Sequence, residues 1–271
     1  MTSLDASGFS ITLLKATPEI LAAIDAPTSA IGWPQTASSF QPYTGNQVLE
    51  GAAAEHGNAR KAVSSGPTVN GDAFTQAVTR ACNALLAAEP QITHNDRIVG
   101  DGDCGATLSR GANAVLKTLS DAPLGASAYA AEAILRIAGA VETSMDGTSG
   151  ALYELFFTAL GSAVQGLSVG EMDVSAWAAA AADALQRLQK MTPARAGDRT
   201  VMDALVPYIE TLGEAKSPDA AVDAARKGRD ATKGMEASLG RAVYVAGENW
   251  SKVPDPGAEG IVAIVEGLAG K

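Results

Sequence analysis

Aromatic residues, cysteine and histidine are all scarce in this sequence. Aromatic residues make up 5% of its 271 residues, and there are two cysteines and two histidines. Cys82 and Cys104 form no CxxC pair and have no metal-ligand spacing, which argues against a zinc site or a disulfide framework and fits a reducing compartment. His56 and His94 are isolated from the partners that would make either one a catalytic base or a ligand.

Basic residues are also few, because 20 lysines and arginines are set against 30 aspartates and glutamates, for a net charge of −10. A nucleic acid or an anionic membrane would need a basic face, so we expect neither as a partner. No stretch approaches the roughly 20 apolar residues that span a bilayer, and the N-terminus lacks the pattern of a signal peptide. We therefore expect a cytoplasmic protein. If it binds phosphate, a metal or a few arginines must neutralise that charge locally.

Helical periodicity is the dominant pattern from Gly71 onward. Hydrophobic residues make up 46% of the chain, and many are alanine, which favours closely packed helices. Pro90 is expected to end the first helix, Gly213 and Gly234 are expected stops, and Ser217 should cap a helix that starts at Pro218. About eight helices with no strand among them, an all-α domain, are predicted from apolar faces. The clearest faces are Phe74, Ala77, Val78, Ala81 and Leu85; Leu152, Leu155, Phe156, Ala159 and Leu160; Trp177, Ala181, Ala184, Leu185 and Leu188; and Val201, Leu205, Ile209 and Leu212.

The N-terminal part differs from the rest. Residues 8–14 alternate apolar and β-branched side chains and predict one strand. A single strand is not stable alone, so it either pairs with another chain or is the remnant of a domain that is absent here. Residues 28–69 are rich in Gly, Ser, Pro, Thr and Gln and predict a linker. The predicted organisation is an N-terminal remnant at 1–27, a linker at 28–69 and a helical domain at 70–271.

The most informative segment is the acidic, glycine-rich stretch DRIVGDGDCG at 96–105. Its G-x-G-x-x-G spacing matches a dinucleotide-binding turn, with Asp121 about 20 residues further on. That motif needs a βαβ unit, whereas the helix expected here at about 105–119 leads into another helix, so we reject it. A calcium EF-hand is excluded too, because positions five and twelve counted from Asp101 are Gly105 and Ala112.

A divalent metal explains the carboxylates better. Asp101 and Asp103 flank Gly102, so their side chains can converge in a tight turn, and Asp96 can fold over the same centre. Oxygen ligands of this kind suit Mg²⁺, which bridges carboxylates to phosphate oxygens. Taken alone, three aspartates in a loop are more often solvated turn residues. The metal hypothesis therefore needs support from other segments.

Several other segments supply it. Residues 146–150, DGTSG, come directly before a helix expected at 151–165, so their N–H groups and hydroxyls can form a phosphate seat. Residues 197–200, GDRT, open another helix in the same style, and residues 255–257, DPG, form a tight turn before the last helix. Arg241 can offer a bidentate fork to phosphate. Each has an ordinary structural explanation, but together they favour a nucleotide pocket. No Walker A sequence and no kinase HRD or DFG segment is present.

With these segments identified, the chain resembles the dihydroxyacetone kinase family, and specifically its L-type ATP-binding domain. The matching motifs are in family order: GDGDCGATLSRGA (100–112), MDGTSGALY (145–153), GDRTVMDAL (197–205), the five residues Gly-Arg-Ala-Val-Tyr (240–244) and DPGA (255–258). SLDASGFSITLL (3–14) is similar to the end of the family's K domain, which binds dihydroxyacetone. The resemblance implies an eight-helix antiparallel barrel with the nucleotide at one end, preceded by an extended segment and a linker.

The resemblance also implies roles for individual residues. A pair of Mg²⁺ ions would bridge the ATP or ADP phosphates, and Arg241 would stabilise the transferring phosphoryl group as the catalytic residue. Asp255, Pro256 and Gly257 would close the site. The implied metal ligands are Asp96, Asp101 and Asp103; the implied phosphate and nucleotide contacts are Cys104, Gly105, Ala106, Thr107, Thr148 and Ser149; and the implied base pocket is Gly197, Leu205 and Val206.

The substrate would be dihydroxyacetone, glyceraldehyde or another short ketose or aldose, held by a K domain in cis or in trans. This chain alone would bind Mg·ATP but phosphorylate that substrate poorly or not at all. A homodimer is compatible with the resemblance. Two alternatives stay open: an FAD-AMP lyase that forms cyclic FMN at the same site, and a non-catalytic nucleotide-binding regulatory module. Asp146 and Glu154 stand where many relatives have glycine, and Asp146 must point away from the phosphates or help to bind the metal.

Overall fold

The computed structural model describes residues 15–24, 26, 63, 65–244 and 249–271, and the chain forms two compact units, Met1–Lys61 and Ala62–Lys271. In the first unit, the described residues include one short helix, α1 (Pro18–Ile24), without a buried residue. The strand predicted at 8–14 lies outside the described residues. So does most of the predicted linker at 28–69.

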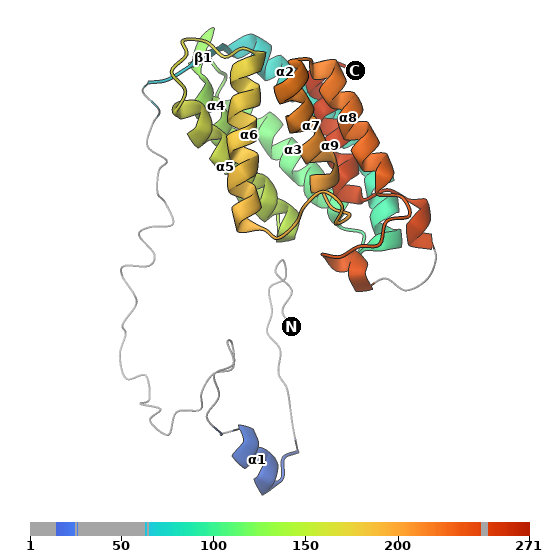
Figure 1. Ribbon diagram of the computed structural model, residues 1–271. Coiled ribbons are helices and arrows are strands. Elements are labelled where there is room, and N and C mark those ends of the chain that lie inside the picture. Colours follow the sequence, from blue (N-terminus) through green and yellow to red (C-terminus); the bar gives the residue numbers. More distant parts are fainter. Residues whose placement is uncertain (1–14, 25, 27–62, 64, 245–248) are drawn as a thin grey trace, which may run out of the picture. The chain divides into compact units, whose positions relative to one another are not determined.

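The described residues of the second unit contain eight α-helices, which confirms the all-α prediction. Each helix packs against the next one in sequence, and α9 packs against α2, so the helices close into a ring (Figure 1). The helices are α2 (Gly71–Val99), α3 (Cys104–Asp121), α4 (Ala130–Ser144), α5 (Gly147–Gln165), α6 (Val174–Met191), α7 (Met202–Ala215), α8 (Pro218–Ala231) and α9 (Pro256–Ala269).

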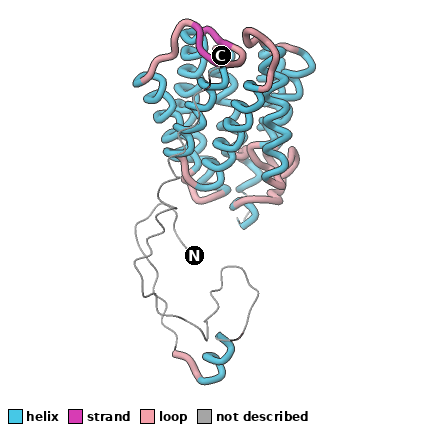
Figure 2. The backbone as a smooth tube through the Cα atoms, turned by 90° about the vertical axis from the view of Figure 1, so that its left-hand side faces the viewer, coloured by secondary structure: helices cyan, strands magenta, loops and turns pink. Residues whose placement is uncertain are grey.

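Two short strands were missed in the sequence. β1 (Thr68–Asn70) pairs antiparallel with β2 (Ser127–Tyr129), with Thr68 opposite Tyr129. Three residues are too few for alternation to stand out from a helical pattern, so this pair follows from tertiary contact and not from a local signal. Figure 2 shows both strands at one end of the helices.

The ring explains why the motifs gather at the other end. When consecutive helices run antiparallel, every second connection lies at the same end. The connections α2–α3, α4–α5, α6–α7 and α8–α9 therefore share one end, which we call the loop end (Figure 1). The α8–α9 connection carries two short 3-10 helices, η1 (Arg241–Tyr244) and η2 (Asn249–Lys252). All five motifs of the sequence begin or lie at this end.

The interior of the ring is apolar. The predicted inward face of α2 is buried at Val78, Ala81 and Leu85. Side chains from all eight helices of the ring line an apolar cavity of about 580 Å³. The α9–α2 contact that closes the ring is very close, because a Cβ on Gly267 would lie 2.6 Å from the carbonyl oxygen of Arg80. None of the described helices combines the length and the hydropathy needed to cross a membrane.

Two predicted helix ends are wrong. Pro90 lies inside α2, which continues for nine more residues to Val99. A proline removes one helical hydrogen bond and favours a helix end, but burial of Ile92 and Val99 beyond it holds the second half in place. Gly213 likewise lies inside α7, which ends at Ala215, where Lys216 takes the left-handed conformation with a φ of 51°. The cap at Ser217 is confirmed, since its side chain accepts from the N–H of Ala220 at 3.3 Å.

Candidate functional site

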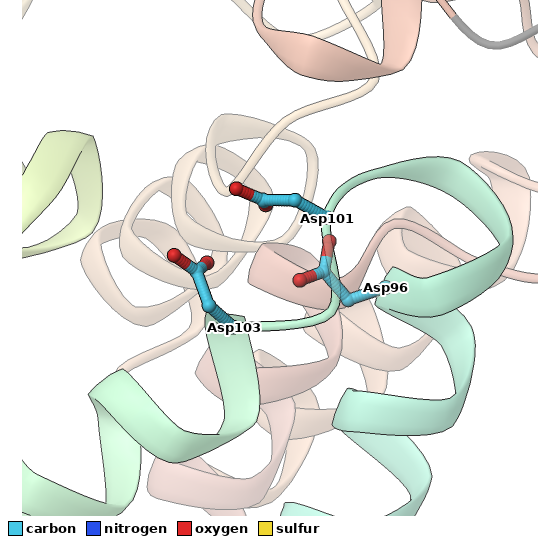
Figure 3. Close-up of side chains that lie close together, drawn as sticks. All are labelled: Asp96, Asp101 and Asp103. Atoms are coloured by element: carbon cyan, nitrogen blue, oxygen red, sulfur yellow. The ribbon is translucent and has the colours of Figure 1, made fainter. Parts of the chain in front are cut away.

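Three carboxylates come together at the loop end. Asp96 is on the last turn of α2, Asp101 lies in the connection that follows, and Asp103 directly precedes α3. One oxygen from each lies within 4.8 Å of the others, and Figure 3 shows the three side chains gathered on one side of the loop. Asp96 is buried and the other two are exposed. Asp96 was expected in the loop; it is helical because α2 runs past Pro90.

Asp96 joins the two helices that border this loop. One oxygen of its carboxylate accepts from the backbone N–H of Cys104 at 2.9 Å, and its carbonyl accepts from the N–H of Gly100 at 2.6 Å. A carboxylate is unfavourable at the negative end of α2 but favourable at the positive end of α3. The bond to Cys104 therefore fixes a buried charge where the dipole of α3 stabilises it. We call residues 96–105 the acidic loop.

The glycines of the acidic loop are needed for three different reasons. A Cβ on Gly100 would lie 2.3 Å from an oxygen of Asp96, so a side chain there would displace the carboxylate. Gly102 has a φ of +80°, which disfavours other residues. A Cβ on Gly105 would lie 2.2 Å from the hydroxyl of Thr93, because α3 starts against α2. The spacing that imitates a dinucleotide motif thus serves a turn between two helices.

The acidic loop has the donor chemistry of a magnesium site. Mg²⁺ binds oxygen ligands at about 2.1 Å in an octahedron, so its ligand oxygens lie about 3 to 4.2 Å apart. Oxygens within 4.8 Å of one another need only a small side-chain movement to reach that spacing. Asp101 and Asp103 are exposed and can adjust, whereas Asp96 is held. The three residues therefore fit one such ion.

The predicted phosphate seat is the first turn of α5. This helix begins at Gly147, four residues earlier than expected, so Thr148 and Ser149 lie within its first turn. Gly147 makes the early start possible with a φ of +64°. The Ser149 side chain lies close enough to the Cys104 thiol to lower its pKa, and α3 contacts α5, so the N-termini of the two helices lie near each other. Two positive helix ends thus border the acidic loop.

Asp146 points to an arginine. Its carboxylate forms an ion pair with Arg110 of α3 at 2.9 Å, with both side chains about half exposed. Arg110 also donates to the Thr107 hydroxyl at 3.2 Å and to the carbonyl of Ser144 at 3.3 Å. The charge that the sequence places next to the phosphate seat is therefore compensated within the protein. Glu154, the other unusual acid, accepts from Thr158 along α5.

Asp255 forms a buried part of the same end. Its side chain caps α9 by accepting from the N–H of Ala258 at 2.8 Å. Burial raises the pKa of Asp255 to about 7, and nearby Asp203 adds to the effect, while the Ala258 N–H and the Arg199 charge oppose it. Burial also raises the pKa of the Cys104 thiol to about 12, helped by the charges of Asp96 and Asp255. The Cys104 thiol is therefore uncharged at neutral pH and does not act as a nucleophile.

Tyr153 lies near Asp255 and Cys104. It is on α5 and lines the apolar cavity, and its hydroxyl is buried without a hydrogen-bond partner among the described residues. Burial raises its pKa, and Cys104 and Asp255 raise it further. Tyr153 thus marks where the polar loop end meets the apolar interior.

The turn at 197–200, which we call the Arg199 turn, is held by buried charges. Asp203 of α7 accepts from the N–H groups of Gly197 and Thr200 at 2.7 and 2.8 Å. Arg199 is 1% exposed. Leu205 and Val206 follow on α7 and are buried in the core. The sequence showed this turn only as a glycine, a hydroxyl and two charges, with no sign that Arg199, Asp203 or Thr232 would be buried together.

Not every candidate residue is placed beside the carboxylates. Gly105 and Thr107 are buried at the start of α3, and Ala106 is exposed between them. Pro256 and Gly257 form the first turn of α9, and Gly257 lies near Val201, at the start of α7. The backbone of Arg241 is in η1, but its side chain lies outside the described part of the structure. The candidate metal ligands and the candidate phosphate contacts thus lie next to each other. The other described candidate residues lie at the same end of the ring but are not shown in contact with the carboxylates.

Comparison with known proteins defines the family of the chain. The DAK2 domain matches residues 98–270, and this chain belongs to the dihydroxyacetone kinase family that carries this domain. The chain is 37% identical over 281 residues to the dihydroxyacetone kinase of Komagataella pastoris, covering 98% of this chain and 45% of that protein. It is 36% identical over 276 residues to the triokinase/FMN cyclase of Homo sapiens, covering 99% of this chain and 46% of that protein.

Two crystal structures resemble the fold. The dihydroxyacetone kinase of C. freundii in its native form matches with a TM-score of 0.62 and 26% identity, over 77% of this chain and 36% of that one. Its complex with AMP-PNP and Mg²⁺ matches with a TM-score of 0.58 and 27% identity, over 72% of this chain and 33% of that one. The chain spans less than half the length of the curated relatives named above.

Proposed function

We propose that this chain is the Mg·ATP-binding part of an ATP-dependent dihydroxyacetone kinase. The observation that carries the proposal is the convergence of Asp96, Asp101 and Asp103 at the N-terminus of α3, beside that of α5. Carboxylates alone would repel a triphosphate. Carboxylates that hold Mg²⁺ between two positive helix ends would bind it. The related C. freundii enzyme was crystallised with AMP-PNP and Mg²⁺, which supports this assignment.

In the proposed arrangement, Mg²⁺ supplies charge neutralisation for the phosphates, and the protein supplies position. Asp96 is the fixed ligand, because the Cys104 N–H holds it, and Asp101 and Asp103 close around the metal. The first turns of α3 and α5 offer N–H groups and the hydroxyls of Thr148 and Ser149 to phosphate oxygens. Positioning and charge compensation of this kind supply most of the acceleration in phosphoryl transfer.

The acceptor would be dihydroxyacetone or glyceraldehyde, bound by a K domain in cis or in trans. Support comes from the relatives, whose names include dihydroxyacetone kinase and triokinase and whose sequences are about twice as long. The alignment with the Komagataella protein covers 98% of this chain, so it includes residues before the helical ring. We therefore expect this chain to bind Mg·ATP but to show little turnover alone.

Calorimetric titration of ATP with and without Mg²⁺ tests the proposal. We expect binding that requires Mg²⁺ and is lost in an Asp101→Asn, Asp103→Asn double variant. Asp121→Asn is the matched control. Asp121 is an exposed carboxylate that pairs with Lys117, and it lies at the C-terminal end of α3, whereas Asp103 lies at the N-terminal end. A folded wild-type chain that binds no nucleotide, or a control that loses binding equally, would contradict the proposal.

A second activity is suggested by the relatives named triokinase/FMN cyclase. The same residues that would bind the metal and the phosphates of ATP would bind the pyrophosphate of FAD, and the reaction would release AMP and cyclic FMN. Incubation of the chain, with and without a K domain, with FAD and Mn²⁺ followed by chromatography of the flavin products tests this candidate. Absence of the cyclic product in both samples, while Mg·ATP still binds, would leave the kinase role alone.

A further inference from the structure

Arg97 is an exposed arginine in the last turn of α2, and it directly follows the buried carboxylate of Asp96. Its side chain lies over the acidic loop at Gly102. A Cβ on Gly102 would lie 2.7 Å from Cγ of Arg97 and 3.7 Å from its Nε. Because Gly102 stands between Asp101 and Asp103, the stem of Arg97 lies against the backbone that joins the two exposed carboxylates. The missing side chain at position 102 gives Arg97 the room for this contact.

This contact places a positive charge close to the candidate metal ligands. Consecutive Cα atoms are about 3.8 Å apart, so the distance from the Arg97 guanidinium to the carboxylates that flank Gly102 is on the order of 10 Å, about one Debye length. The stem of the side chain is held at Gly102, whereas its exposed end can turn toward a phosphate that a metal holds at the loop.

Arg97 differs from the other arginines at the loop end because its donors are unused. Within the described ranges, its guanidinium makes no hydrogen bond and no ion pair. The other described arginine side chains at this end have partners in the protein: Arg110 has Asp146; Arg195 has the carbonyls of Gln189, Thr192 and Ala194; Arg199 has the carbonyls of Thr232, Trp250 and Val253; and Arg229 has Glu259. Arg97 therefore keeps its N–H groups available for a ligand.

A role in stability accounts for Arg97 only in part. A cation in the last turn of a helix interacts favourably with the negative end of the helix dipole. The same cation lies close to the place where the carboxylates would hold Mg²⁺, and two cations repel each other. Arg97 is therefore unfavourable for a metal alone. It is favourable for a metal that carries phosphates, because a guanidinium forms charge-assisted, bidentate hydrogen bonds with phosphate oxygens.

We propose that Arg97 is a further nucleotide-binding residue, whose guanidinium binds a phosphate of the metal-bound nucleotide at the acidic loop. The inference rests on the proposed function, in which Asp96, Asp101 and Asp103 hold Mg²⁺. The acidic loop then supplies both positive charges that the phosphates meet, the metal on its carboxylates and the arginine over its glycine. In a chain with a net charge of −10, this local cation offsets the repulsion of an approaching nucleotide.

Separate measurements of metal affinity and nucleotide affinity test the inference. Electron paramagnetic resonance gives the dissociation constant of Mn²⁺ without nucleotide, and calorimetry at saturating Mg²⁺ gives those of ADP and AMP-PNP. We expect Arg97→Met to bind Mn²⁺ about two- to threefold more tightly, because a like charge is removed. The same variant should bind both nucleotides about tenfold more weakly, because a phosphate loses its partner.

A lysine at this position separates charge from geometry. Arg97→Lys keeps the positive charge but not the planar fork of the guanidinium. Its affinity for Mn²⁺ should equal that of the wild type, and its affinity for the two nucleotides should lie between those of the wild type and Arg97→Met.

Lys190→Met is the matched control. Lys190 is also an exposed cation in the last turn of a helix, and that helix, α6, ends at the loop end. However, α6 packs against α5 and α7, whereas the acidic loop joins α2 and α3. Lys190→Met removes the same charge from a helix end, so it should change the melting temperature as much as Arg97→Met does. Its affinities for Mn²⁺ and for the nucleotides should stay unchanged.

The outcomes separate this inference from the proposed function. If the folded wild type binds neither nucleotide, the proposed function fails and this inference with it. If the wild type binds both and Arg97→Met keeps their affinities, only this inference is overturned. A joint loss of Mn²⁺ and nucleotide affinity in Arg97→Met overturns it too, because Arg97 would then act by shaping the acidic loop. Should Arg97→Met fail to fold, Arg97→Gln takes its place with the same expectations.

Discussion

The acidic loop and the Arg199 turn lie at the same end of the ring, but they use charge in opposite ways. The acidic loop exposes two of its three carboxylates and buries the third only far enough to fix it by the Cys104 N–H. The Arg199 turn buries its cation almost completely and directs it to backbone carbonyls. The first arrangement exposes carboxylates to solvent, and the second uses a buried charge to hold the chain.

Under the proposed function, the difference explains how one end of a helical ring would bind a polyphosphate in an acidic protein. Exposed carboxylates side by side cost stability through repulsion, and a metal ion would relieve that cost on binding. A buried arginine with backbone partners stabilises the loops around the site whether or not a ligand is bound. Substitutions in the Arg199 turn should therefore change mainly the free energy of unfolding, and substitutions in the acidic loop should change mainly the affinity for metal and nucleotide.

The largest change in stability is expected at the Arg199 turn. Arg199→Met leaves the carbonyls of Thr232, Trp250 and Val253 without their donor, which should lower the free energy of unfolding by about 3 kcal/mol. Urea denaturation measures this value. The Asp101→Asn, Asp103→Asn variant should lose less stability than Arg199→Met, because both carboxylates are exposed. Equal losses in both variants would remove the contrast between the two regions.

The next effect concerns metal affinity. Gly100→Ala places a Cβ 2.3 Å from an oxygen of Asp96 and should weaken Mn²⁺ binding about 30-fold by moving one ligand. Electron paramagnetic resonance of free Mn²⁺ gives the dissociation constant. Gly213→Ala is the control, because nothing lies within 4 Å of its Cβ and it is inside α7. The control should keep its affinity and gain about 0.5–1 kcal/mol of stability.

The next effect is on the pH dependence of stability, and it is expected at Asp255, which lies between the acidic loop and the Arg199 turn. Its folded pKa of about 7 exceeds the value of about 3.9 for an unfolded chain, so the folded state holds the proton longer. Stability therefore falls as pH rises from about 4 to about 7. Asp255→Asn keeps the cap and should be more stable than the wild type by about 2 kcal/mol at pH 8, with a smaller gain at pH 4. A gain that does not change with pH would contradict the raised pKa.

The smallest effect is expected at the half-exposed pair of Arg110 and Asp146. Its contribution to stability should be at most about 1 kcal/mol. Arg110→Met leaves the Asp146 charge uncompensated near the first turn of α5, and should weaken Mg·ADP binding about threefold through repulsion. Adding Asp146→Asn should restore the affinity. If the second change brings no recovery, Arg110 acts through Thr107 or Ser144 instead.

Much of the fold was predictable because helices depend on local spacing. The apolar faces of α2, α5, α6 and α7, the cap at Ser217 and the turn at 255–257 are each encoded within a few neighbouring residues. The acidic loop was predictable for the same reason, since Asp101, Gly102 and Asp103 are adjacent. The prediction failed at Pro90, where burial of residues further along α2 outweighed a local signal to stop. It also failed at Gly213, because α7 continues to Ala215 and ends where Lys216 takes the left-handed conformation.

The sequence by itself thus determined the helices and the segments that carry chemistry. The tertiary structure alone decided that Asp146 points to Arg110, that Asp96 is the fixed carboxylate, and that Arg199 spans from α7 to both ends of the α8–α9 connection. The physical reason is separation along the chain. Arg199 and Trp250 are 51 residues apart, and a hydrogen bond between such residues exists only once the ring has closed and buried them.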